Sequence, residues 1–179
     1  MPARDGLPAS MRMFHVKRWV ERGCDRLMHV RSADWIFRQS LGTDAEWMAD
    51  LRALVLRADL ERLGRYDEQR VRERFLAAFS PQNTRVIVRD GRDVGLVAVR
   101  SDGEVRWIEH FYLEPTMQGM GIGGQVLGEI LADSPDSAHR LNVLQGSAAR
   151  RLYVRHGFEV EREDAVDVFM IRTASSRRS

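Results

Sequence analysis

The chain has 179 residues, of which 44% are hydrophobic and 30% are charged, a composition typical of one globular domain with its own core. No apolar run approaches the roughly 20 residues that a membrane helix needs, and no apolar stretch of a secretory signal stands near the N-terminus. The formal net charge is +2, but the positive charge gathers at both ends, which leaves an acidic middle without a basic surface for nucleic acid. The single cysteine, Cys24, cannot form an internal disulfide, and this favours a cytoplasmic protein.

Residues 1–33 read as a basic N-terminal extension. Their apolar side chains recur at helical spacing, namely Met13, Val16, Val20, Cys24 and Leu27. Two interpretations stay open: a mobile leader or over-long gene start, or a short amphipathic helix that contacts a membrane surface or a partner. We expect a domain over residues 34–172 and a flexible basic tail over residues 173–179.

The first half of the domain predicts one strand and two helices. Residues 35–38 form an apolar strand, and Thr43–Glu46 fits a capping box at the start of a helix. Asp67 and Glu68 place negative charge at the first turn of a second helix, which favours its dipole. Ser80-Pro81 ends that helix.

The second half begins with strands. Residues 84–88 and 94–100 read as a hairpin because Asp90-Gly91 is a strong turn signal, and residues 104–113 form a third strand. After a glycine-rich segment, the pattern predicts a helix over 122–133, a strand over 141–144, a helix over 148–155 and a strand pair over 158–162 and 166–171.

The segment Leu113–Gly124 joins a strand to a helix and contains four glycines. Glycines allow backbone amides to turn toward a ligand, and the first turn of a helix has unpaired N–H donors and partial positive charge. Together these features predict an anion cradle suited to a diphosphate. Gly119, Gly121 and Gly124 also match the dinucleotide fingerprint, but residues 114–118 separate that match from the strand, and the preceding strands form antiparallel hairpins. We therefore do not expect NAD binding.

The spacing Gln118-x-x-Gly121-x-Gly123 resembles the acetyl-CoA loop of the GCN5-related N-acetyltransferases (GNAT family). The resemblance extends to Phe111–Pro115 before the loop and to a second motif, which spans Val143–Leu144, Ala149–Tyr153 and Gly157–Phe158. The element order fits from Trp35 to Ile171. The resemblance implies an α/β (α+β) GNAT fold with a mixed, mostly antiparallel sheet of about six to seven strands and about four helices.

The resemblance implies acetyl-CoA as co-substrate and an N-acetyltransferase that transfers the acetyl group directly to a primary amine of a small molecule, peptide or protein. The residues it assigns to acetyl-CoA are Phe111, Tyr112, Leu113, Gln118, Gly119, Met120, Gly121, Ile122, Gly123, Gly124, Ser147 and Tyr153. Many relatives carry Asn at the position of Ser147, whose hydroxyl is expected to bond the coenzyme instead. Strands that end at Leu113 and Leu144 are expected to splay apart around the pantetheine arm.

Two residues are the catalytic candidates. Glu109 is the expected general base, since on a regular strand it would share a face with Phe111 and Leu113 near the splayed ends. His110 would face the other way and is expected to be structural. Tyr153 matches the family's tyrosine and is the expected general acid for the coenzyme thiolate. The alternatives for Glu109 are a solvent-facing or salt-bridged strand glutamate, or transfer without a base in which bulk water takes the proton. The alternatives for Tyr153 are a hydrogen bond to the coenzyme sulfur or packing next to Leu152 and Phe158.

Three acidic residues near the final strand pair, Glu161, Glu163 and Asp164, suggest a cationic amine acceptor, with an ordinary acidic turn as the alternative. The five histidines lie scattered without ligand spacing, so no metal is expected. A homodimer is a further expectation.

Two alternatives to an enzyme stay open. The chain could be an acyl-CoA-binding sensor without turnover, or a protein that serves only in protein–protein interaction. A donor with a longer acyl chain than acetyl also stays open.

Overall fold

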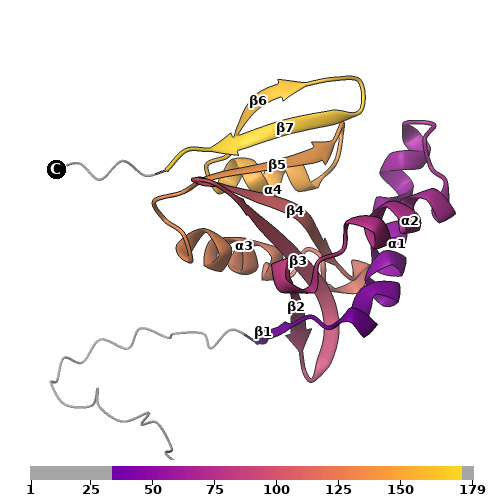
Figure 1. Ribbon diagram of the computed structural model, residues 1–179. Coiled ribbons are helices and arrows are strands. Elements are labelled where there is room, and N and C mark those ends of the chain that lie inside the picture. The colour runs from indigo at the N-terminus through magenta and orange to yellow at the C-terminus, as the bar shows by residue number, and fades with distance from the viewer. Residues whose placement is uncertain (1–33, 175–179) are drawn as a thin grey trace, which may run out of the picture. The chain divides into compact units, whose positions relative to one another are not determined.

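Figure 1 shows the computed structural model, which describes residues 34–174. The expected extension over residues 1–33 and most of the tail lie outside the described residues. The strands are β1 (Trp35–Gln39), β2 (Thr84–Arg89), β3 (Arg92–Asp102), β4 (Val105–Leu113), β5 (Ala138–Leu144), β6 (Glu159–Glu163) and β7 (Asp167–Arg172). The helices are α1 (Ala45–Arg62), α2 (Glu68–Ala78), α3 (Ile122–Ala132) and α4 (Ala149–Arg155).

All seven strands form one sheet in the order β1-β2-β3-β4-β5-β7-β6. Every neighbouring pair is antiparallel except β4 and β5, which run parallel because α3 connects them. The mixed, mostly antiparallel sheet expected from the sequence is confirmed, as is the element order.

Two clusters of buried side chains hold the helices to the sheet. The smaller core joins α1 and α2 to one face of the sheet and consists of Met48, Ala49, Leu51, Phe75, Val86 and Leu96. The larger core lies against α3 and α4 and includes Val97, Ile108, Leu113, Val126, Leu127, Tyr153 and Met170. Successive side chains of β3 point to opposite faces of the sheet, so Leu96 enters the smaller core and Val97 enters the larger one.

The β2–β3 hairpin turns at the expected Asp90-Gly91. Their φ angles are 51° and 74°, a combination that a two-residue hairpin needs and that Gly and Asp tolerate best. From this turn β2 and β3 pair along their length, starting with Arg89 opposite Arg92 and ending with Thr84 opposite Ala98.

The start of α1 differs from the expected capping box. Asp44 rather than Thr43 holds this corner, because its carboxylate accepts from the backbone N–H of Leu41 at 2.8 Å and from the indole of Trp47 at 3.1 Å. Two nitrogens of Arg38 complete the site at 2.8 and 2.9 Å. The Arg38 hydrogen bond holds the pKa of the Asp44 carboxyl well below its usual range.

Candidate active site

β4 and β5 separate partway along their length. Their parallel pairing runs from Val105–Ala138 to Ile108–Leu141 and then stops, although β4 continues to Leu113 and β5 to Leu144. The edge of β4 beyond Ile108 therefore has no strand on its β5 side. The expected splay between these strand ends is present.

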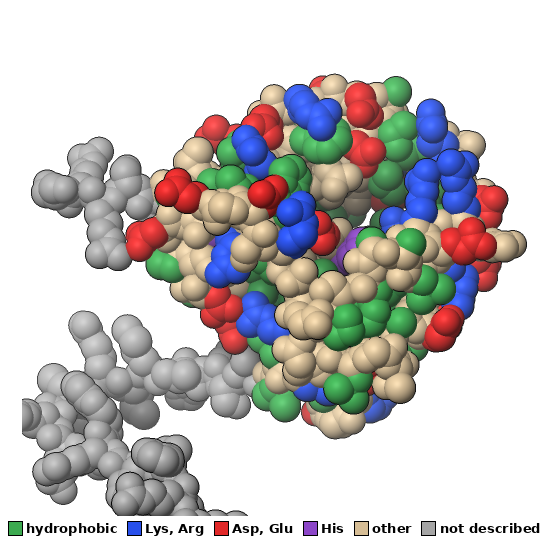
Figure 2. All heavy atoms as spheres, viewed as in Figure 1, with side chains coloured by type: hydrophobic (Ala, Val, Ile, Leu, Met, Phe, Trp, Pro, Cys, Tyr) green, Lys and Arg blue, Asp and Glu red, His purple; other side chains and the backbone are tan. Residues whose placement is uncertain are grey.

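A cavity of about 940 Å³ opens at the splay. Its walls come from α1, α2, the ends of β4 and β5, the start of α4 and the turn before β7. Figure 2 shows the hollow, with a histidine side chain inside it and basic side chains along the side formed by α1 and α2. A cavity of this size admits a small ligand together with a flexible arm.

The loop over residues 115–124 carries β4 into α3. Gly119 and Gly121 have φ angles of 76° and 86°, and a Cβ at either would meet nothing within 4 Å, so the space beside the loop is open. Among the described residues, no backbone carbonyl accepts from the amides of residues 119–123. These amides lead into the N-terminus of α3 at Ile122 and form a cradle that fits an anionic group.

Two side chains hold this loop in place. Gln118 donates from Nε2 to the carbonyl of Leu113 at 3.0 Å, so its amide shapes the loop. His156 lies between two helices, with Nε2 3.1 Å from the carbonyl of Gly124 and Nδ1 2.9 Å from the carbonyl of Leu152. Sequence reasoning missed His156, which joins the end of α4 to the first turn of α3.

Glu109 is the extra residue of a β-bulge. Ala98 pairs with His110 and Val99 with Ile108, so Glu109 has no partner on β3. The bulge shifts the alternation, and the expectation that Glu109 shares a face with Phe111 is wrong. Glu109 instead lines the cavity beside His110, where its Oε1 accepts a 2.6 Å hydrogen bond from Nε of Arg100.

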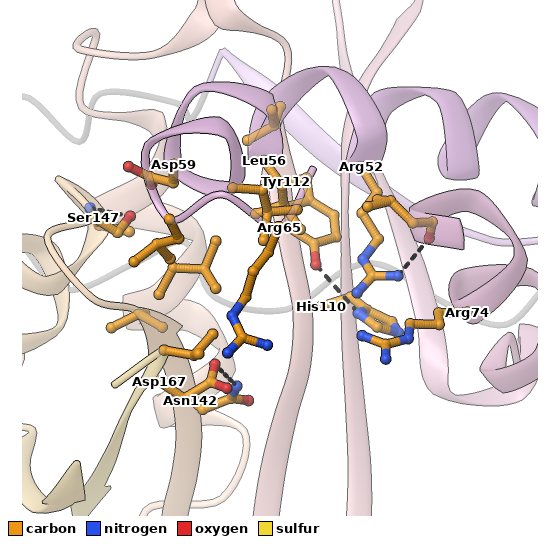
Figure 3. A pocket seen from close by; sticks show the side chains of 18 of the residues that line it. Arg52, Leu56, Asp59, Arg65, Arg74, His110, Tyr112, Asn142, Ser147 and Asp167 are labelled. Atoms are coloured by element: carbon orange, nitrogen blue, oxygen red, sulfur yellow. Dashed lines mark hydrogen bonds between the residues drawn. The ribbon is translucent and has the colours of Figure 1, made fainter. Parts of the chain in front are cut away.

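His110 lies on the face opposite Phe111, as expected, and also lines the cavity. Its ring lies 4.9 Å from the ring of Phe75, and its Nδ1 lies 3.4 Å from the hydroxyl of Tyr112 (Figure 3). Burial, with a smaller contribution from Arg52, lowers the pKa of His110 to about 4. The imidazole is therefore neutral at physiological pH.

Tyr153 lies on α4 at the inner wall of the cavity. It is buried, packs edge-on against Phe158 and has no hydrogen-bond partner for its hydroxyl among residues 34–174. Burial first, and the neighbouring Tyr112 second, raise the pKa of the Tyr153 phenol well above its usual range. The hydroxyl therefore stays protonated at neutral pH and keeps an O–H that it can donate.

The remaining expected coenzyme residues fall into two groups. The side chains of Leu113 and Ile122 are buried in the larger core, which leaves their backbone for a ligand, and Phe111 packs against that core and also lines the cavity. Ser147 lines the cavity, and its Oγ accepts from the N–H of Ala149 at 3.4 Å. Tyr112 lines the cavity with its ring.

A profile of the acetyltransferase (GNAT) domain matches residues 80–160, the stretch that contains the splayed strands, the glycine loop and Tyr153. The chain therefore contains a stretch of GNAT acetyltransferase domain. The resemblance stated from the sequence is thereby confirmed, and with it the class of acetyl-CoA-dependent N-acetyltransferases.

Solved GNAT-type structures share the fold. The chain is similar to the PaiA N-acetyltransferase from Thermoplasma acidophilum in complex with coenzyme A, with a TM-score of 0.63 and 18% identity over 78% of this chain and 98% of that one. It is similar to Ard1 from Thermoplasma volcanium, with a TM-score of 0.60 and 18% identity over 80% and 99% of the two chains. It is also similar to an N-acetyltransferase from Staphylococcus aureus Mu50, with a TM-score of 0.60 and 16% identity over 76% of this chain and 99% of that one. A search of curated proteins found no match.

The three acidic residues near the final strand pair, β6 and β7, already have partners within the protein. Glu161 pairs with Arg140 at 2.6 Å, and Glu163 lies 3.9 Å from Arg150. Asp164 accepts from the amides of residues 166 and 167 at 2.8 Å each. These contacts, with the Asp167 amide as the largest cause, lower the pKa of Asp164.

Over residues 34–174 of this GNAT protein, no cluster of three or more His, Cys, Asp or Glu is arranged to hold a metal ion. Within the same residues, none of the helices combines the length and the apolar character that a bilayer crossing requires.

Proposed function

We propose that this GNAT protein transfers an acetyl group from acetyl-CoA directly to a primary amine that enters the cavity between β4 and β5. The observation that carries the proposal is the splay itself, since it lies beside a cavity lined by Glu109 and Tyr153 and at the end of β4, the strand that leads into the open anion cradle. Acetyl-CoA supplies the activated acyl thioester. The residues around the splay hold it, exclude water and move protons.

The glycine loop is the proposed binding site of the coenzyme diphosphate. Five backbone amides over residues 119–123 lack an acceptor in the described chain and stand at the N-terminus of α3. Backbone donors in this arrangement favour a doubly charged anion through both hydrogen bonds and the helix dipole. The free edge of β4 near Phe111 and Leu113 then supplies backbone groups for the pantetheine arm.

Glu109 is the proposed proton acceptor. A lysine-like amine with a pKa near 10.4 is only about 0.04% neutral at pH 7, a handicap of roughly 4.6 kcal/mol, which a base or ordered water at the cavity relieves. Glu109 lines the cavity as a carboxylate paired with Arg100. His110 is the second candidate because its ring is neutral and lies in the same cavity.

Tyr153 is the proposed proton donor to the departing thiolate. Its hydroxyl is buried at the cavity wall and stays protonated, so it can donate a hydrogen bond or a proton to sulfur. The departing sulfur carries negative charge as the C–S bond breaks, and a hydrogen bond or proton from the phenol stabilises it as the coenzyme thiol, whose pKa is near 8.5.

The finer expectations remain proposals: a small-molecule or peptide amine as acceptor, a cytoplasmic location and a homodimer. A coenzyme-binding sensor without turnover is the competing function, because the same cradle would serve it. Thiol release from acetyl-CoA in the presence of a primary-amine panel distinguishes them. We expect amine-dependent release with formation of the acetylated amine by mass spectrometry, whereas saturable coenzyme binding without any release would identify a sensor.

A further inference from the structure

Four arginines of the cavity lining form no salt bridge with the described residues. They are Arg52, Arg65, Arg70 and Arg74. Among the described residues, no carboxylate oxygen lies within 4 Å of any of their guanidinium nitrogens. Positive charge that gathers on one wall without a partner is an arrangement that favours an anionic ligand.

The carboxylates of the same cavity all have partners. Their contacts are Asp59 with Arg62, Asp67 with the N–H of Arg70, Glu109 with Arg100, Asp164 with two backbone amides, and Asp167 with the side chain of Asn142. Asp59 and Glu109 are neutralised by arginines, whereas Asp67, Asp164 and Asp167 bond to neutral groups and keep their charge. Asp164 and Asp167 enter from the turn before β7 and the start of β7, and Arg52 and Arg74 enter from α1 and α2, so the unpaired positive charge lies on the helix side of the cavity. Glu161 and Glu163 pair with arginines outside the cavity lining.

Arg52 is held in position for such a ligand. Its Nη1 donates to the backbone carbonyl of Val71 at 2.7 Å, which fixes the guanidinium of α1 against α2. Its Nε is buried and has no hydrogen-bond partner in the described residues. A buried N–H without a partner is costly, so an acceptor atom from a ligand would satisfy it.

Arg74 extends the same wall. Figure 3 shows the side chains of Arg52, Arg74 and His110 together on one side of the cavity, with Arg65 reaching in from the chain between α1 and α2. Arg70 and Arg74 stand four residues apart on α2, where like charges repel each other. An anion between them and Arg52 would relieve that repulsion.

We propose that the acceptor amine carries a carboxylate or phosphate group, which Arg52 and Arg74 bind while the amine lies toward Glu109. This inference rests on the proposed acyl transfer and names the acceptor class. It replaces the cationic acceptor suggested by Glu161, Glu163 and Asp164.

The test compares amines that differ only in charge at the far end. The series runs from glycine to 6-aminohexanoate, each with its amide and with the diamine of equal length, and 3-aminopropylphosphonate separates phosphate-type from carboxylate binding. Saturation-transfer NMR with the full chain and coenzyme A reports binding without turnover, and thiol release from acetyl-CoA reports transfer.

We expect the anionic amine to bind and react better than its amide by roughly tenfold or more, the size of one charge-assisted hydrogen bond. Arg74→Gln should remove the preference, and Arg74→Lys should restore part of it. Arg52→Gln should act in the same direction. Arg155→Gln is the matched control, since Arg155 is also exposed and without an ion pair but lies on α4 outside the cavity lining, and it should keep the preference.

Equal binding of anionic and neutral amines, or a preference for the diamine, overturns the inference even where acetyl transfer proceeds. Anion-selective binding without any thiol release supports the anion site and counts against acyl transfer instead. A preference that survives both Arg74→Gln and Arg52→Gln also overturns it.

Discussion

Nε of Arg100 donates a 2.6 Å hydrogen bond to Oε1 of Glu109 across the β3–β4 bulge. The two residues lie on neighbouring strands and are both partly exposed, so the pair adds little to stability, on the order of 0–1 kcal/mol. Its effect is positional, because it holds the proposed proton acceptor in the lining of the cavity.

Glu109→Gln removes the proposed proton acceptor and keeps the shape of the side chain. We expect kcat to fall about 10²-fold or more, with the KM for acetyl-CoA nearly unchanged, because a general base typically contributes about 10²–10⁴. Steady-state rates from pH 6 to 9 provide the measurement. Arg100→Gln keeps the carboxylate but removes the hydrogen bond that positions it, so it should lower kcat less than Glu109→Gln does. An unaltered kcat in Glu109→Gln would show that water or His110 takes the proton.

Tyr153→Phe removes only the hydroxyl from the cavity wall. Because the ring still packs against Phe158, we expect an intact fold and a kcat lowered by roughly ten- to hundredfold. Tyr66→Phe is the control, since that phenol lies outside the cavity lining and bonds only to Glu68. Equal rates for Tyr153→Phe and the wild type would remove Tyr153 from the chemistry.

Gly121→Asp places a carboxylate in the proposed diphosphate cradle. We expect the Kd for coenzyme A to rise by about tenfold or more through repulsion of the phosphates, as measured by calorimetry. Gly103→Asp matches its backbone strain, because Gly103 also has a positive φ of 60° and open space around it but lies in the β3–β4 turn. Coenzyme binding unchanged at Gly121 would contradict the cradle.

Gly95→Ala tests the close contact between β3 and β4. A Cβ at this position would stand 2.5 Å from the carbonyl oxygen of Tyr112, so the strands must move apart, and we expect a loss of about 1–3 kcal/mol or more. Gly128→Ala inside α3 meets nothing within 4 Å and should stabilise the protein by about 0.5–1 kcal/mol. Urea unfolding monitored by circular dichroism measures both, and a stable Gly95→Ala would refute the contact.

His110 predicts a specific dependence of stability on pH. Its pKa falls from about 6.5 to about 4 on folding, so the unfolded chain binds more protons between these values and the folded state loses stability as the pH falls through them. The loss approaches roughly 3 kcal/mol below pH 4. The free energy of unfolding, measured with urea, should depend on pH more steeply in the wild type than in His110→Gln over this window. Burial also lowers the pKa of His139, but His139 is present in both proteins. Parallel curves would mean that His110 is solvated in the folded state.

Local sequence patterns predicted most of the fold. Asp90-Gly91 marked the hairpin because few residues tolerate positive φ there. The negative charge of Asp67 and Glu68 marked the start of α2, where the structure makes Asp67 the N-cap, which accepts from the N–H of Arg70 at 3.0 Å. At α1 the same reasoning chose Thr43, whereas Arg38 and Trp47 assemble the corner around Asp44. Such a corner depends on a strand and a helix meeting, which a four-residue motif does not specify.

The sequence alone determined the glycine loop, since the spacing from Gln118 to Gly123 reflects backbone geometry within one short segment. The tertiary structure decided the chemistry around it. Strand pairing introduced the bulge that turns Glu109 toward the cavity, because a bulge depends on the register of β3 against β4 and not on either strand alone. Folding likewise decided which charges find partners: Arg52 and Arg74 come together on one wall without a carboxylate, and that arrangement arises only when α1 and α2 pack beside β4.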